Sequence, residues 1–408
     1  MFHLLFAWRY FRAKKSTQAI NIIAWISMVA IALITAAFIV LLSVFNGFEG
    51  LVKSLYSSFY PDLRITPLNG KVFTIPDPVF DKIRDMQGVA FSSGVVEERA
   101  LLQNGDFQTI ISLKGVDTHY RQVTGVFGKI DRGGYAIGDV EHPGLVMGGA
   151  IASIIGSDVE KDIYPLSIYL FRRGVALNTL DASQYFSSAT IRATGTFFIQ
   201  QDIDSKYAIT NGAFMRQMLG LRSDEYSSLE VRLAHADATD RVQQQLQTLL
   251  GKDFLIENRY QQNKSLYSVM VTEKWAVYGI LCLMLVVAAF TMIGSLTMLV
   301  MEKQKDIQVL KAMGASNGRI RGIFLAEGFL LGCLGGFSGL LLGVAICMGQ
   351  VTFKWVGIQG GTFLIDYYPV AMDPADFLVV GATVILVALI ASWVPARKAA
   401  IQPIELRT

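Results

Sequence analysis

Few residues in this 408-residue chain have the types and spacing that catalysis or metal binding requires. The sequence has no His-Glu-x-x-His pair, no Gly-x-Ser-x-Gly nucleophile turn and no Gly-x4-Gly-Lys-Ser/Thr phosphate loop. The three cysteines fall inside apolar runs, where a thiol packs as a small hydrophobic group. We therefore expect no catalytic residue, no metal site and no cofactor within this chain. The histidines and cysteines of the chain, which are scattered and lack metal-ligand spacing, are His3, His119, His142, His235, Cys282, Cys333 and Cys347.

A charged segment between two long apolar runs has the pattern of a docking element. From Glu302 to Ala315, charged and apolar residues alternate at helical spacing, and Gly314 stands where a helix would end in a left-handed cap. Such a segment, taken alone, is also typical of a solvated turn between two membrane helices. The residues that a docking helix would use are Glu302, Lys303, Lys305, Asp306, Ile307, Leu310, Lys311, Met313 and Gly314.

The apolar runs on either side of this segment predict a membrane protein. The chain is 52% hydrophobic and only 17% charged, and its mean hydropathy is +0.42. Its net charge of +3 is too small and too dispersed to indicate nucleic-acid binding. The first apolar run is too long for a cleavable signal peptide. We predict four membrane-spanning helices at 16–48, 275–301, 323–349 and 377–396.

Basic residues at the ends of the spans predict the orientation. They gather before the first span, between the second and third, and after the fourth, which places both termini in the cytoplasm. Segment 1–15 reads as an interfacial helix, 302–322 as the charged helix and its loop, and 397–408 as a cytoplasmic tail. The segments 49–274 and 350–376 would then lie outside the cytoplasm.

The long outer segment has the pattern of an α+β domain. Strand and helix patterns at 63–66 and 78–86 precede a hairpin turning at Asn104 and Gly105. A second strand, helix and strand lie at 229–233, 240–250 and 254–257. We predict a discontinuous membrane-proximal part, 49–115 and 227–263, with 116–226 inserted into it. A helical pattern from Lys264 runs unbroken into the second span.

Two features of the third span concern packing. Glycines recur there every four residues from Gly335 to Gly343, a spacing that lets another helix approach closely. Glu327 lies near the start of this span, about one turn from Arg321. We interpret Glu327 as an interfacial ion pair or a solvated group without a catalytic role.

The order of these elements resembles the FtsX/MacB-type permease family of ABC transporters, and within it the LolC/LolE permeases of the lipoprotein-releasing system. The resemblance rests on Leu42-Ser43-Val44-Phe45-Asn46-Gly47-Phe48-Glu49 after the first span, on the 301–315 segment, and on the ending from Val394 to Arg407. It implies an α-helical membrane protein with four transmembrane helices and a large α+β extracytoplasmic domain made of a porter and an inserted sabre subdomain.

The resemblance also implies a function and a set of partners. The chain would be a non-catalytic permease in the bacterial inner membrane that passes lipoproteins to a periplasmic carrier. Its partners would be a cytosolic ATPase dimer that binds ATP and Mg, a second permease copy or homologue, and membrane lipids. The 302–314 segment would be the coupling helix, with Ile307, Leu310 and Met313 filling a groove on the ATPase. Alternatives are a MacB-like efflux permease and an FtsX-like regulator of a cell-wall hydrolase.

Two further sites follow from the resemblance alone. A hook that captures the carrier would fall within 172–187 and use Arg172, Arg173, Leu177, Leu180, Tyr185 and Phe186. Lipid or lipoprotein access would involve the outer ends of the first two membrane helices, with Val44, Phe45, Asn46, Phe48, Tyr267 and Met270.

Overall fold

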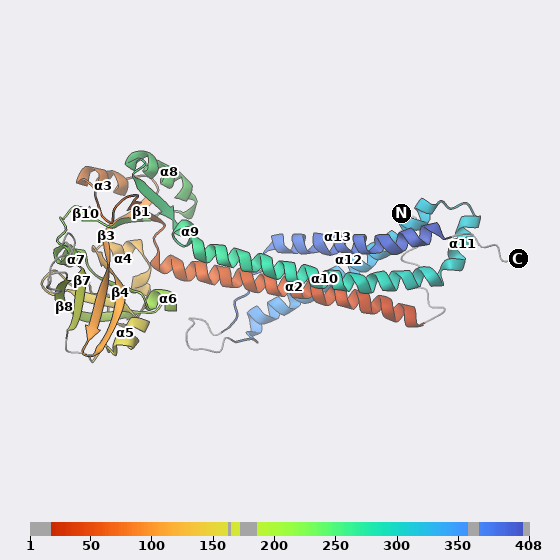
Figure 1. Cartoon of the computed structure of the whole chain (residues 1–408), viewed down its shortest axis with the longest axis horizontal. Coiled ribbons are helices and arrows are strands. Elements are labelled where there is room, and N and C mark those ends of the chain that lie inside the picture. The colour runs from red at the N-terminus through yellow and green to blue at the C-terminus, as the bar shows by residue number, and fades with distance from the viewer. Residues whose placement is uncertain (1–17, 162–164, 172–185, 358–366, 403–408) are drawn as a thin grey trace, which may run out of the picture. The chain divides into compact units, whose positions relative to one another are not determined.

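Four long apolar helices form the greater part of a helical unit (Figure 1). The structure is a computed structural model that describes residues 18–161, 165–171, 186–357 and 367–402. The chain divides into the helical unit (1–51, 268–359 and 365–408) and a sheet unit (52–267 and 360–364). The helices are α2 (Gln18–Phe59), α10 (Lys264–Glu302), α11 (Gln304–Ala312), α12 (Asn317–Phe353) and α13 (Pro374–Ile401).

A long apolar helix covers each of the four predicted spans, and α10, α12 and α13 extend beyond the predicted span at both ends. The predicted first span stops at the first charge, but helix α2 continues to Phe59 because no helix breaker occurs before Pro61. Helix α10 runs unbroken from Lys264, as predicted. The segment predicted as an N-terminal interfacial helix lies outside the described residues.

Two rows of small residues on α12 let neighbouring helices approach it from different sides. A Cβ atom added to Gly339 would lie 2.4 Å from the Ala32 carbonyl oxygen of α2. A Cβ atom added to Gly332 would lie 2.4 Å from Ala388 Cβ of α13. The predicted close packing is therefore confirmed and involves two neighbouring helices, because the two glycine rows are turned from each other by about 60° around α12. The rows are Gly335, Gly339 and Gly343 toward α2, and Gly328, Gly332 and Gly336 toward α13.

The sheet unit is built around a ten-stranded sheet in the order β12-β1-β11-β3-β4-β9-β6-β8-β5, with β7 paired to both β3 and β8. The strands are β1 (Leu63–Pro67), β3 (Val89–Asn104), β4 (Phe107–Val116), β5 (Ile130–Gly133), β6 (Gly144–Gly148), β7 (Leu166–Phe171), β8 (Phe186–Phe197), β9 (Tyr207–Asn211), β11 (Ser228–Leu233) and β12 (Phe254–Asn258). A separate pair joins β2 (Phe73–Thr74) to β10 (Glu225–Tyr226).

Short helices cover this sheet. They are α3 (Asp77–Arg84), α4 (Tyr120–Val123), α5 (Gly149–Ile155), α6 (Gln201–Asp204), α7 (Gly212–Leu219), α8 (Thr239–Leu250) and α9 (Arg259–Gln262), with 3-10 turns η1 (Val126–Lys129) and η3 (Ala236–Ala238). The hairpin predicted at Asn104-Gly105 is confirmed, and Gly105 has the positive φ of 56° that such a turn requires. The predicted strands and helices at 63–66, 78–86, 229–233, 240–250 and 254–257 are confirmed within two residues.

Strand β3 connects two parts of the sheet that have separate cores. Its first half pairs with β11, beside β1 and β12, where α3 and α8 contribute Ile83, Val242 and Leu246 to one core. Its second half joins a closed ring of strands, β3-β4-β9-β6-β8-β7, around another core. The 89–116 hairpin thus pairs both with strands of the predicted insertion and with strands of the predicted membrane-proximal part. The porter and sabre boundaries stay a prediction.

A buried ion pair lies where the two parts of the sheet meet. Lys114 Nζ of β4 donates a hydrogen bond to Glu230 Oε1 of β11 over 2.8 Å, and the two side chains are only 2% and 0% exposed. The ammonium also lies 4.8 Å from the centre of the Phe59 ring. Burial, and after it the charge of Glu230, raises the pKa of Tyr120 well above its usual range, so its hydroxyl stays neutral beside the pair.

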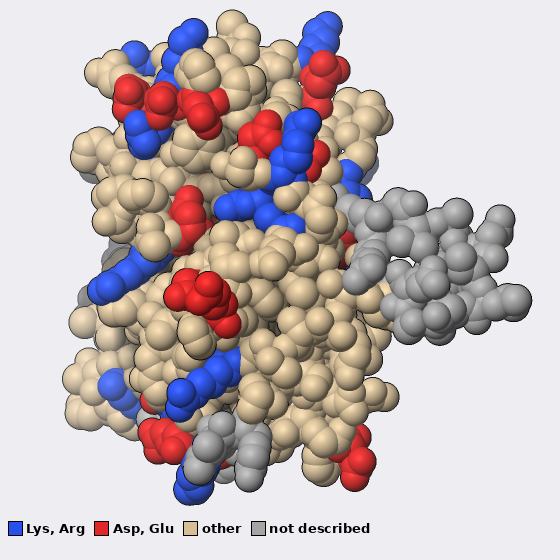
Figure 2. Space-filling model, turned by 90° about the vertical axis from the view of Figure 1, so that its left-hand side faces the viewer, with Lys and Arg blue, Asp and Glu red and all other residues tan. Residues whose placement is uncertain are grey.

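Charges on one face of the sheet unit are of mixed sign. Figure 2 shows acidic and basic side chains interspersed over the face turned to the viewer, without a broad patch of one sign among the described residues. Such a surface gives no directional field for a polyanion.

Candidate functional site

Helix α11 is the charged segment singled out in the sequence. Its end at Met313 is a left-handed glycine cap: Gly314 has φ 89°, its N–H donates to the Lys311 carbonyl, and the Ala315 N–H donates to the Leu310 carbonyl. This pair of bonds satisfies two carbonyls that would otherwise lack partners. The predicted short helix and its cap are confirmed, whereas contact with an ATPase stays a prediction.

The inner face of α11 packs against the helical unit itself. Ile307 is 3% exposed and belongs to a core cluster with Ile320, Phe324, Ala396 and Ala399. Ile307 therefore faces its own subunit, and its predicted contact with a groove on the ATPase stays a prediction. The helical pattern predicted a buried face but could not say which molecule buries it.

Lys311 joins α11 to the end of α13. Its Nζ donates hydrogen bonds to the carbonyl oxygens of Ala400, over 2.9 Å, and Gln402, over 2.5 Å. The last carbonyls of a helix lack intrahelical partners and carry the negative end of its dipole, so a lysine there both bonds and neutralises them. A displacement of α11 would therefore be transmitted to α13.

The outer face of α11 remains exposed. Lys305, Val309 and Met313 follow one another at intervals of four residues, and Val309 and Met313 are 59% and 77% exposed. Val309 was not among the predicted residues, because helical spacing assigns the apolar face to Ile307 and Leu310. The remaining predicted residues are less exposed or pair locally: Leu310 is half-buried, and Lys303 lies 3.5 Å from Asp306. Glu302 is half-buried at the end of α10.

Glu327 does not have the interfacial ion pair that the sequence suggested. Its side chain is buried within the helical unit, and its Oε2 atom has no hydrogen-bond partner among the described residues. Arg321 instead places its guanidinium 5.1 Å from the centre of the Trp393 ring. Arg321 and Glu327 are six residues apart, about 1.7 turns of a helix, so their side chains point toward different neighbours of α12.

At the other end of the bundle, Asn46 connects three helices. Its Nδ2 atom donates a hydrogen bond to Asp376 Oδ2 of α13 over 2.7 Å, and its Oδ1 atom accepts one from Lys274 Nζ of α10 over 2.8 Å. Lys274 and Asp376 are themselves 3.6 Å apart and partly exposed. We call this set of three residues the Asn46 junction. Only Asn46 was identified from the sequence, because its partners are single charges at the ends of distant spans.

The residues around Asn46 hold the chain segment that precedes α13. The Ser43 carbonyl accepts a hydrogen bond from Ala371 N–H over 2.9 Å, and the Phe48 ring lies 5.7 Å from the Tyr368 ring. A Cβ atom on Gly47 would lie only 2.3 Å from the Pro369 carbonyl oxygen, so only glycine fits there. The Ser-Val-Phe-Asn-Gly-Phe motif therefore fixes α2 against α10, α13 and the 368–371 segment.

The other predicted residues differ in burial, and some lie outside the described residues. Val44 and Phe45 are half-buried on α2, Met270 is half-buried on α10, and Tyr267 is buried beside the Tyr260 ring. Their predicted role in lipid access stays a prediction. Of the predicted hook, only Phe186 lies within the described residues, where its ring packs 4.6 Å from that of Phe171. Arg172, Arg173, Leu177, Leu180 and Tyr185 lie outside them.

Comparison with known proteins connects these features to a family of permeases. Residues 278–404 match the family described as FtsX-like permease C-terminal. Over 98% of its length the chain is similar to the lipoprotein-releasing system transmembrane protein LolE of Haemophilus influenzae, with 24% identity and 97% of that relative covered. It is also similar to LolC of Xylella fastidiosa, with 25% identity over 97% of this chain and 96% of the relative.

Among solved structures, the chain is similar to the periplasmic region of MacB from Actinobacillus actinomycetemcomitans. The identity is 12%, the TM-score is 0.36, and the match covers 53% of this chain and 98% of that one.

Proposed function

We propose that this ABC transporter permease, whose residues 278–404 form an FtsX-like domain, extracts lipoproteins from the inner membrane and passes them to a periplasmic carrier. The observation that carries the proposal is the similarity to LolE and LolC, which extends over nearly the whole chain rather than over the permease domain alone. Energy would come from a separate cytosolic ATPase, because the sequence has no phosphate loop.

The coupling step assigns different tasks to the two faces of α11. The exposed face of Lys305, Val309 and Met313 contacts the ATPase, and the inner face and Lys311 carry its movement into α12 and α13. This requires the α11 end of the bundle to be cytoplasmic, which the basic residues there support. Two ATPase subunits would pair with two permease copies or homologues.

The extraction step would involve the Asn46 junction. Each methylene of an acyl chain buried in the bilayer contributes about 0.8 kcal/mol, so an acylated protein does not leave the membrane unaided at a useful rate. The junction holds α2, α10 and α13 together at the end of the bundle remote from α11. Separation of these helices would admit acyl chains between them, and their closure would displace the chains.

A reconstitution tests the proposal. The purified permease and its ATPase are placed in proteoliposomes with a labelled triacylated lipoprotein, and a soluble lipoprotein carrier is added outside. We expect the label to appear on the carrier only when ATP is hydrolysed. ATP hydrolysis without transfer, in the presence of both candidate permease copies, would contradict lipoprotein release.

A further inference from the structure

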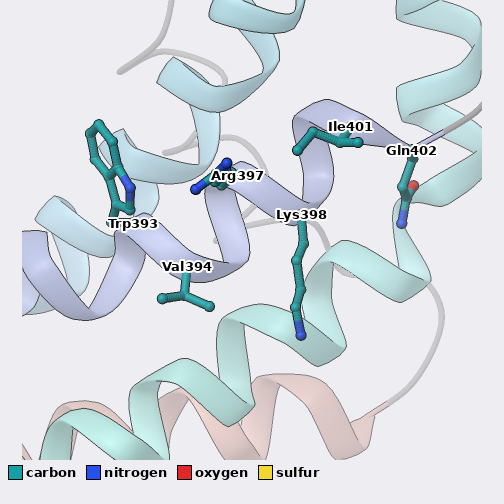
Figure 3. Close-up of a pocket in the computed structure, with 6 residues that line it drawn as sticks. All are labelled: Trp393, Val394, Arg397, Lys398, Ile401 and Gln402. Atoms are coloured by element: carbon teal, nitrogen blue, oxygen red, sulfur yellow. The ribbon is translucent and has the colours of Figure 1, made fainter.

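The end of α13 near α11 bears a pocket that none of the steps above uses. Its volume is about 440 Å³, and the described residues that line it come from the last turns of α13 and from Gln402, which follows the helix (Figure 3). Two cations, an aromatic ring and two aliphatic side chains meet there, and no acidic side chain is among the lining residues that the structure describes. The lining residues are Trp393, Val394, Arg397, Lys398, Ile401 and Gln402.

The outward face of α13 leads from the membrane-spanning part into this pocket. Along one row, Leu386 and Ile390 are 59% and 64% exposed, and the next residues at the same interval are Val394 and Lys398. The adjacent row runs Leu389, Trp393, Arg397 and Ile401. Residues four apart share one helix face, so both rows change from apolar groups to a cation at the same level.

We propose that this pocket binds the headgroup of an anionic phospholipid in the leaflet on the α11 side. An apolar row that ends in an aromatic ring and then a cation matches the order of acyl chain, interface and phosphate across one leaflet. Figure 3 shows that the side chains of Arg397 and Lys398 leave the helix in different directions, so the pocket has a cation on each of two sides.

Neighbouring contacts support the same occupant. The Arg321 guanidinium, 5.1 Å from the centre of the Trp393 ring, adds a third positive charge beside the pocket and holds the ring at this level. Among the described residues, neither Arg397 nor Lys398 has an acidic side chain as an ion-pair partner. The site depends only on the chain spanning a membrane and not on lipoprotein release.

Native mass spectrometry of the full-length protein released from nanodiscs tests the site. The nanodiscs contain phosphatidylcholine and phosphatidylglycerol, and the bound lipids are counted. We expect preferential retention of phosphatidylglycerol. The double substitution R397Q/K398Q should weaken this retention by about tenfold or more, because each of the two cations strengthens binding to an anionic lipid. The charge-preserving R397K/K398R should retain it. R319Q is the matched control, because Arg319 is an exposed cation of α12 at the same end but does not line the pocket.

Four results would overturn the assignment. An equal loss in R319Q would show a general charge effect, and equal retention of phosphatidylcholine would show that the headgroup is not recognised. Displacement of phosphatidylglycerol by millimolar inorganic phosphate would identify a site for a soluble anion instead. Unchanged lipid retention in R397Q/K398Q, together with lost co-purification of the ATPase, would likewise assign the surface to that protein.

Discussion

Asn46 and Asp376, separated by 330 residues in the sequence, share a 2.7 Å hydrogen bond that joins α2 to α13. The same amide accepts from Lys274, so one side chain satisfies both members of a partly exposed ion pair. A partly exposed ion pair alone contributes little to the free energy of folding. The amide of Asn46 adds two hydrogen bonds, which hold the two flexible charged side chains in fixed positions.

We predict that N46A and D376N are not additive. Each single change should lower the free energy of unfolding of the helical unit by about 1 kcal/mol, and the double variant should lose less than the sum. The tryptophans within the described residues, Trp25, Trp275, Trp355 and Trp393, all lie in the helical unit, so intrinsic fluorescence during denaturation in detergent reports on it. Strict additivity would mean that the two residues act independently.

Gly47 and Gly50 offer a matched pair on one helix. A Cβ atom at position 47 would overlap the Pro369 carbonyl, whereas at position 50 it would meet no atom within 4 Å. G47A should therefore destabilise the protein by about 1 to 3 kcal/mol through overpacking. G50A should be neutral or stabilise by up to about 1 kcal/mol, because alanine favours helix. Thermal unfolding followed by tryptophan fluorescence measures both, and equal shifts would disprove the close approach at Gly47.

For the buried pair of Lys114 and Glu230, we predict that removing one charge lowers the free energy of unfolding more than removing both charges. K114M leaves Glu230 buried without its cation and should cost about 3 to 5 kcal/mol, whereas K114M/E230L should recover most of that loss. R64M is the control, because Arg64 pairs with Glu97 at 25% and 17% exposure and should cost about 1 kcal/mol. Amide hydrogen exchange of β4 and β11 in the full chain measures the change. A double variant as unstable as K114M would mean that packing, not charge, determines the loss.

Asp204 predicts a pH dependence of the sheet unit. Burial raises the pKa of Asp204 to about 6, although hydrogen bonds from the backbone act in the opposite direction. Because the folded pKa exceeds the unfolded one, the contribution of Asp204 to stability is greatest below about pH 4 and is lost as the pH rises through about 6. The loss would be on the order of 2 to 3 kcal/mol between these limits. D204N should remove this slope in hydrogen-exchange measurements of β9, while D202N, at an exposed position, should preserve it.

The elements of this fold could be predicted from the sequence, but most of its long-range partners could not. Periodicity and length identify α10, α11 and the hairpin at Asn104-Gly105 because those signals are local. The closure of β7 onto both β3 and β8, and the burial of Glu327, depend on how separate segments rotate and meet. In the candidate site, Asn46 was found through its motif, whereas Lys274 and Asp376 had no local signal.

Helix α11 gives the sharpest test of the proposed coupling, because its two faces predict different failures. V309D/M313D changes only exposed side chains, so the permease should fold normally, lose co-purification of its ATPase by about tenfold or more, and stop releasing substrate. I307A truncates a buried side chain and should lower the free energy of unfolding by about 2 to 4 kcal/mol. It should not prevent ATPase binding at low temperature. Co-purification, ATPase activity and tryptophan-monitored unfolding separate the two effects. If V309D/M313D binds the ATPase as the unaltered chain does, the exposed face of α11 is not the docking surface.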